Sequence, residues 1–293
     1  MKLTTAIRRF DEQLRAEGKS PVTQEIYIRD VQRLSGWLGA NATIGDITPH
    51  ALTRFINSKA FSHTRDGVPK APVSLNRSKS AIRTFFRFLT EAGYLQDNPA
   101  RLVKLARTPK KPPRPMTSAD ANRFLSAIKK HGDPLATRDY VIFRLMLATG
   151  IRLGALVRIN VGDVDVVGRT IRIRTKGEVE QVVYLSRSLA RELQRHVKRR
   201  SGGSAALFQS QGGGPLKARQ VQIRFSQWVR AAGIQRHYTV HSLRHAFATR
   251  LYEQTRDIRL VQKAMGHARV TTTEIYAESE DAAVHQAVRK LSV

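Results

Sequence analysis

The chain has 293 residues, enough for two domains that each bury a core of their own. Its 51 lysines and arginines against 23 acidic residues give a net charge of +28, and residues 1–114 (+12) and 115–293 (+16) are both basic. No apolar run approaches the roughly 20 residues of a membrane span, and the absence of cysteine excludes disulfides, thiolate metal sites and cysteine nucleophiles. The charge favours a polyanionic partner, because each neutralised phosphate releases condensed counterions. Nucleic acid is therefore the expected partner.

Apolar residues recur at helical spacing throughout the first hundred residues, which predicts an all-helical domain over residues 1–107. The fourth predicted helix buries Ile82 and Leu89 and ends at Gly93. Its other side carries Lys79, Arg83 and Arg87 at intervals of four. Such a stripe is either a solvated face or a surface for phosphates, and the basic charge of both halves favours contact with DNA phosphates. The three earlier stripes that predict helices are Leu3, Ile7, Phe10 and Leu14, then Tyr27, Val31, Leu34 and Leu38, and then Leu52, Phe55 and Ile56.

Residues 108–115 hold four prolines and three basic residues. Proline removes backbone donors and enforces an extended backbone, so this segment cannot be a helix and is predicted to be a semi-rigid cationic linker. It separates the helical domain from a larger second domain over residues 116–293.

The second domain is predicted to be helical around a small sheet. Thr117 has the character of an N-cap, and residues 139–149 are nearly all apolar, which predicts a central buried helix. Between residues 163 and 185 the pattern alternates with period two, with a turn at Lys176-Gly177, which indicates a small antiparallel sheet. A further amphipathic helix runs from Val221 to Gly233. The predicted fold class is mainly α with one small antiparallel sheet.

Several residues that can act on a phosphodiester follow in this domain, and each is weak evidence alone. His241 and Arg244 are three apart on a predicted helix and so share a face. Arg152 directly follows the buried helix, where an arginine that is simply solvated or paired is also expected. His267 follows Gly266, where it can also be a capping residue at the end of a helix. A single tyrosine such as Tyr276 is more often part of a core or an interface.

Metal sites are not expected. His241 and His245 have the spacing of a zinc pair, but the metalloprotease pattern needs a glutamate after the first histidine, where Ser242 stands. Asp163 and Asp165 are better explained as solvated residues at a strand edge. No cofactor or metal is predicted.

Taken in order, the motifs resemble the tyrosine recombinase/integrase family. They are Thr-Gly-x-Arg, a Lys-Gly hairpin turn, His-x-Leu-Arg-His, Gly-His, and a tyrosine nine residues after that histidine. The resemblance covers the second domain and extends to the first, which resembles the helical core DNA-binding domain of the family. It implies that the catalytic residues are Arg152, Lys176, His241, Arg244, His267 and Tyr276.

These side chains suit one reaction. The Tyr276 phenol has an ordinary pKa near 10 and needs cations to favour its attack on phosphorus. Arg152 and Arg244 can stabilise the pentacovalent transition state, and Lys176 can protonate the departing 5′ oxygen. The resemblance implies a 3′-phosphotyrosine and a free 5′ hydroxyl. One departure is that the family's acidic residue three positions after the first arginine, which supports the site, is here Ala155.

The resemblance is strongest to the simple two-domain Xer-type recombinases, because only a few residues precede the first predicted helix. It implies duplex DNA as substrate, strand exchange in a homo-tetramer (with or without a paired second recombinase) and a cytoplasmic, nucleoid-associated protein. Val284, Val288 and Leu291 form an apolar stripe that either folds onto its own domain or docks on a neighbouring protomer. A type IB topoisomerase and a catalytically weak DNA-binding protein remain alternatives. Neither the DNA site nor the choice between dimer resolution and mobile-element integration follows from the sequence.

Overall fold

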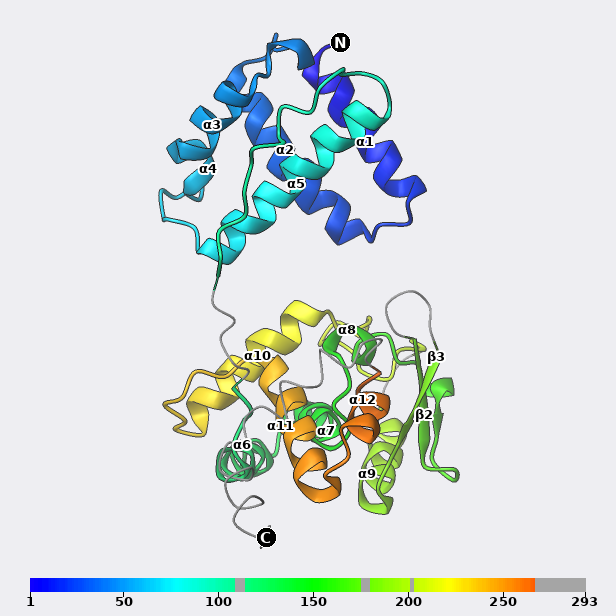
Figure 1. Cartoon of the computed structure of the whole chain (residues 1–293). Helices are drawn as coiled ribbons and strands as arrows, with labels where there is room; N and C mark the ends of the chain where they lie inside the picture. Colours follow the sequence, from blue (N-terminus) through cyan, green and yellow to red (C-terminus); the bar gives the residue numbers. More distant parts are fainter. Residues whose placement is uncertain (109–113, 175–179, 201–202, 267–293) are drawn as a thin grey trace, which may run out of the picture. The chain divides into compact units, whose positions relative to one another are not determined.

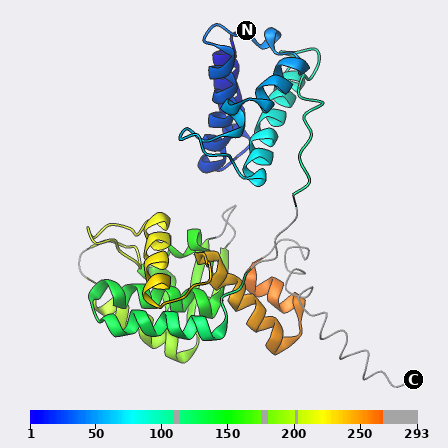
Figure 2. The ribbon, with the colours of Figure 1, turned by 90° about the vertical axis from the view of Figure 1, so that its left-hand side faces the viewer.

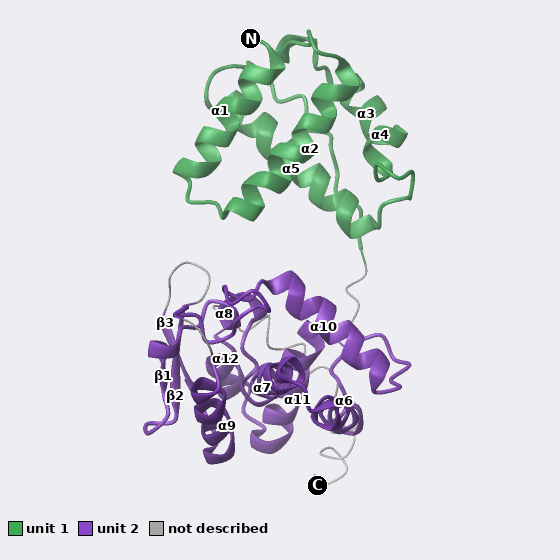
Figure 3. Ribbon diagram, turned by 180° about the vertical axis from the view of Figure 1, so that it is seen from behind, with its two compact units in different colours: residues 1–110 green, residues 111–293 purple. Residues whose placement is uncertain are grey.

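A computed structural model describes residues 1–108, 114–174, 180–200 and 203–266. The chain divides into two compact units, Met1–Lys110 and Lys111–Val293 (Figure 3). The boundary between them falls within the proline-rich segment 108–115, of which residues 109–113 lie outside the described part.

The first unit is a helical bundle (Figure 1), and its core combines aliphatic side chains with several phenylalanines. Phe10, Phe55, Phe85 and Phe86 are fully buried where α1, α2, α3 and α5 meet. The four helices predicted from apolar spacing are all present, and a four-residue helix, α4, is added because one turn is too short to show periodicity. The helices are α1 (Leu3–Ala16), α2 (Pro21–Leu38), α3 (Pro49–Asn57), α4 (Lys59–Ser62) and α5 (Pro72–Glu91), with a 3-10 turn over Ile44–Asp46.

The second unit is mainly helical and carries a small antiparallel sheet at one edge, so the predicted fold class is confirmed (Figure 1). The sheet has the order β1-β2-β3, with Ile171 opposite Val183 in the β2–β3 pair. No helix in the described part of the chain is long and apolar enough to cross a membrane. The elements are α6 (Ser118–His131), α7 (Pro134–Thr149), α8 (Leu153–Leu156), a 3-10 turn over Val161–Asp163, β1 (Val164–Asp165), β2 (Thr170–Arg174), β3 (Glu180–Tyr184), α9 (Arg187–Lys198), α10 (Ala218–Ala231), α11 (Val240–Thr255) and α12 (Ile258–Met265).

Helix α7 is the centre of this unit, as its apolar sequence predicts, and α6, α9 and α11 pack against it. Helices α11 and α12, orange in Figures 1 and 2, lie side by side. Near the start of α7 the buried carboxylate of Asp139 accepts hydrogen bonds from Arg138, Arg224 and the indole of Trp228. Because Arg224 and Trp228 belong to α10, this buried network ties α10 to the central helix.

Candidate active site

Arg152 is placed by the sharp end of α7. Gly150 follows the helix in the left-handed conformation, with φ +64°, and turns the chain so that Arg152 becomes the residue before α8. The Arg152 side chain is half-buried and its Nη2 donates to the backbone oxygen of Gly266 at 3.3 Å. The first predicted arginine is therefore held by the end of α12, a segment more than one hundred residues further along the chain.

Arg244 lies in the second turn of α11 and is 4% exposed. Its Nη1 donates to the oxygen of Gly150, and its Nη2 donates to the oxygen of Met265 at 2.6 Å. The guanidinium thus joins the turn before Arg152 to the same end of α12. The structure brings the two predicted arginines onto one backbone support.

Gly150 is required at this turn by two independent constraints. A left-handed backbone disfavours any side chain, and a Cβ there would lie 2.4 Å from Cδ1 of Phe247. We expect Gly150→Ala to lower the free energy of unfolding by about 1–3 kcal/mol, measured by urea denaturation. Gly154→Ala is the matched control, since its Cβ would meet nothing within 4 Å. Equal stability of the two variants would contradict this account of the turn.

His241 lies in the first turn of α11, on the surface, with its ring edge-to-face against His245 at 4.7 Å between centroids. Partial burial of the ring lowers the pKa of His241, and the positive charges of Arg244 and Arg152 lower it further. The imidazole is therefore neutral at pH 7, with one nitrogen able to donate and the other able to accept. The two arginines thus place a neutral histidine in an electropositive environment.

The electrostatic coupling predicts a measurable titration. In the free protein we expect an NMR titration to place the pKa of His241 below its ordinary value of 6.5. Arg152→Gln removes a repelling charge and is expected to raise that pKa. Arg230→Gln, which removes an arginine of α10 that is not among the charges lowering this pKa, is the charge-matched control and is expected to leave it unchanged. A pKa that does not respond to Arg152→Gln would show that the two side chains do not interact.

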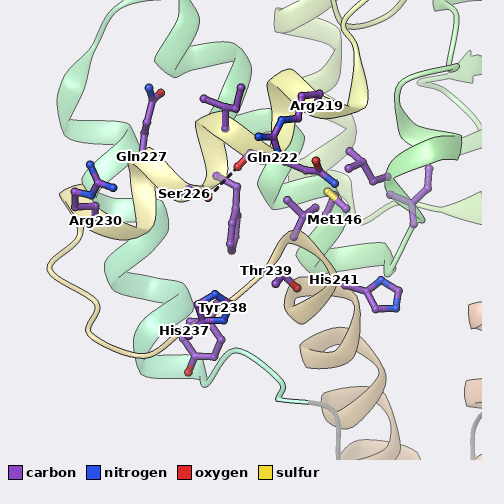
Figure 4. Close-up of a pocket in the computed structure, with 15 residues that line it drawn as sticks. Met146, Arg219, Gln222, Ser226, Gln227, Arg230, His237, Tyr238, Thr239 and His241 are labelled. Carbon is purple, nitrogen blue, oxygen red and sulfur yellow. Dashed lines mark hydrogen bonds between the residues drawn. The ribbon is translucent and has the colours of Figure 1, made fainter. Parts of the chain in front are cut away.

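A hollow of about 800 Å³ opens beside His241, between α10 and the segment that leads into α11 (Figure 4). Helix α10 lines it with polar side chains, among them Arg219, Gln222, Gln227 and Arg230. This surface was missed from the sequence, where only the apolar side of α10 was interpreted. The signal was available, because glutamine and arginine recur on the side opposite Val221, Phe225 and Trp228.

Arg152 is held without the acidic residue that the family has three positions further along the chain. Ala155 is buried in α8, and the hydrogen bond that the structure gives Arg152 goes to a carbonyl, not to an acidic side chain. Gln181 of β3 was also missed. It donates to the oxygen of Ala264, in the same last turn of α12 that holds both arginines.

The remaining predicted catalytic residues, Lys176, His267 and Tyr276, lie outside the described residues.

In the first unit, the basic stripe on α5 faces the segment that follows the helix. Lys79 donates to the oxygen of Lys104, while Arg83 and Arg87 line a hollow of about 220 Å³ with Arg101. The stripe is thus partly used within its own unit.

Both units of the chain match known protein families. Residues 114–283 match the phage integrase family, and residues 7–93 match its N-terminal SAM-like domain. Tyrosine recombinase XerC of Neisseria meningitidis serogroup C is 31% identical over 91% of this chain and 88% of that protein. Tyrosine recombinase XerC of Xylella fastidiosa is 34% identical over 88% of this chain and 86% of that protein.

Solved structures agree. The XerA recombinase crystal structure is 26% identical and aligns over the whole of both chains with a TM-score of 0.55. A lambda integrase dimer bound to a COC′ core site, at 20% identity, shares the fold over 93% of this chain and 97% of that chain with a TM-score of 0.73. The chain therefore belongs to the phage integrase family and is a tyrosine-type site-specific recombinase.

Proposed function

We propose that this recombinase cuts and rejoins duplex DNA through a covalent bond between Tyr276 and the 3′ phosphate of the cleaved strand. The observation that carries the proposal is the convergence of Arg152 and Arg244 on the end of α12, directly before the segment that contains His267 and Tyr276, with His241 close enough for both charges to lower its pKa. These three groups, which can bind a phosphodiester, come from two separate parts of the sequence: the turn after α7 and the start of α11.

In the proposed reaction Arg152 and Arg244 donate to the non-bridging oxygens of the scissile phosphate. Negative charge on these oxygens increases as phosphorus becomes pentacovalent, so donors held in place beforehand stabilise the transition state more than the ground state. Fixation of Arg244 by two backbone oxygens serves this purpose, because its side chain does not have to be ordered when DNA binds.

The remaining steps are proton transfers. The Tyr276 oxygen forms the new bond to phosphorus as the bond to the 5′ oxygen breaks, and the phenolic proton passes to a neutral base. His241 is suited to accept a proton or a hydrogen bond, since its lowered pKa keeps it neutral at pH 7. Lys176 is proposed to protonate the 5′ oxygen and His267 to bind the phosphate. Attack of the 5′ hydroxyl on the phosphotyrosine reverses the reaction without a high-energy cofactor.

DNA contacts are proposed on both units. On α10, Arg219, Gln222 and Arg230 combine positive charge with side chains that form paired hydrogen bonds to base edges. Lys79, Arg83 and Arg87 of α5 are proposed to contact backbone phosphates, through the side-chain donors that the contacts within their own unit leave available. The chain is proposed to act as a tetramer, as the lambda integrase does in its structure bound to a Holliday junction. We also propose that the protein is cytoplasmic and associated with the nucleoid.

The test is covalent trapping. Incubation with a nicked duplex, from which the cleaved end diffuses away, is expected to give a protein–DNA adduct that survives denaturation. Peptide mapping should place the DNA on Tyr276, and sequencing of trapped genomic fragments should converge on one short site. An adduct on another residue would overturn the assignment. Efficient relaxation of supercoiled plasmids without a shared site would instead indicate a topoisomerase.

A further inference from the structure

Gln181 occupies an inward position in β3 that strand alternation normally gives to an apolar residue. Along β3, Gln181 and Val183 are the less exposed residues, whereas Glu180, Val182 and Tyr184 are exposed. A polar group removed from water costs free energy unless it is hydrogen-bonded. The Gln181 amide meets this requirement by donating from Nε2 to the backbone oxygen of Ala264 at 3.1 Å.

The contact between Gln181 and α12 is closely fitted. Gly266, at the end of α12, has φ +58°, and a Cβ at this position would lie 2.4 Å from Oε1 of Gln181. The flat amide therefore packs directly against the glycine backbone. This packing brings β3 and the helix end into direct contact, and a side chain at residue 266 would push the Gln181 amide aside.

At the C-terminal end of α12, three successive backbone carbonyls accept hydrogen bonds from side chains in three different parts of the second unit. At the C-terminal end of an α-helix the last carbonyls lack partners within the helix and carry the negative end of the helix dipole. Each of the three is bonded by one side chain: the oxygen of Ala264 by Gln181, that of Met265 by Arg244, and that of Gly266 by Arg152. Two of these donors are the proposed phosphate-binding arginines, and the third is a neutral amide.

We propose that Gln181 is a positioning residue for the cleavage reaction: it anchors the last turn of α12 to β3 and thereby fixes where Met265 and Gly266 hold the two arginines. The inference rests on the proposed function, in which Arg152 and Arg244 bind the scissile phosphate. Of the three donors only Gln181 takes no part in binding the phosphate. Without it, the side-chain hydrogen bonds to this turn come only from the guanidinium groups that the turn has to hold, so the turn can shift with them when they bind the phosphate.

The experiment measures cleavage and binding separately. Gln181→Met keeps the length and apolar stem of the side chain but removes the amide. With a nicked duplex we expect the single-turnover rate of adduct formation to fall about 10- to 100-fold, as small displacements of catalytic groups do, while the affinity for DNA stays unchanged. Val182→Ala, on the exposed side of the same strand, is the control and is expected to cleave at the wild-type rate.

A double-mutant cycle distinguishes positioning from a general structural role. If Gln181 acts through Arg152, the loss caused by Gln181→Met is expected to be much smaller in an Arg152→Lys background than in the wild type, because the effects of residues coupled through a shared backbone turn are not additive. Additive losses, or wild-type cleavage by Gln181→Met, would overturn the proposal. Gln181→Glu, which keeps the shape but cannot donate at neutral pH, repeats the test if the methionine variant is poorly folded. A wild-type chain that forms no adduct would overturn the proposed function itself.

Discussion

Tyr276→Phe is expected to bind its DNA site with wild-type affinity and to form no covalent adduct at all. The substitution removes one oxygen, the atom that would form the bond to phosphorus, and retains the aromatic ring. No other group replaces a nucleophile at this position, so the loss of cleavage is complete, whereas most binding energy comes from contacts with the DNA backbone elsewhere. Denaturing electrophoresis with labelled DNA, alongside a mobility-shift assay, measures both quantities.

Tyr252→Phe is the matched control, because it removes a phenolic oxygen from a half-buried tyrosine of α11. It is expected to form adduct at the wild-type rate. Adduct formation by Tyr276→Phe would show that another residue attacks the phosphate. Loss of DNA binding by the same variant would show that Tyr276 acts in the structure and not in the chemistry.

Arg244→Ala is expected to have the second largest effect, and to reduce both catalysis and stability. Loss of one preorganised donor to the transition state typically costs about 10²- to 10³-fold in rate. In addition, the oxygens of Gly150 and Met265 lose a buried partner, which costs about 1–3 kcal/mol for each unsatisfied group. Single-turnover cleavage at saturating protein and urea denaturation measure the two effects independently.

Arg152→Gln provides the comparison within the same site. It is expected to lose cleavage to a similar extent but to keep a free energy of unfolding close to that of the wild type. The reason is exposure: Arg152 is half-buried and gives one long hydrogen bond to Gly266, whereas Arg244 is buried and gives two to the backbone. If both variants cleave at the wild-type rate, the proposed phosphate site is wrong. If Arg244→Ala is as stable as Arg152→Gln, the structural role given to Arg244 is wrong.

Much of the architecture was predictable because local forces determine it. Apolar spacing predicts α1, α2, α3 and α5, the nearly continuous apolar run predicts the central α7, and alternation predicts the β2–β3 pair. The helix stop at Gly266 was also predictable, since glycine favours the left-handed backbone there. Elements without such a local signal were missed: α4 is too short, and in α9 charged residues surround the few apolar positions.

The candidate site likewise has features that the sequence predicts and features that depend on long-range contacts. Composition and motif order by themselves predicted a polyanionic partner and indicated which residues can act on a phosphodiester and which family they resemble. Only the tertiary structure decided how Arg152 is held in a chain with Ala155, and that Gln181 shares the turn that holds both arginines. The physical reason is that these contacts join side chains to backbone carbonyls from 21 to 114 residues away. A carbonyl is common to all residues, so no residue type in the sequence marks the ones that are used.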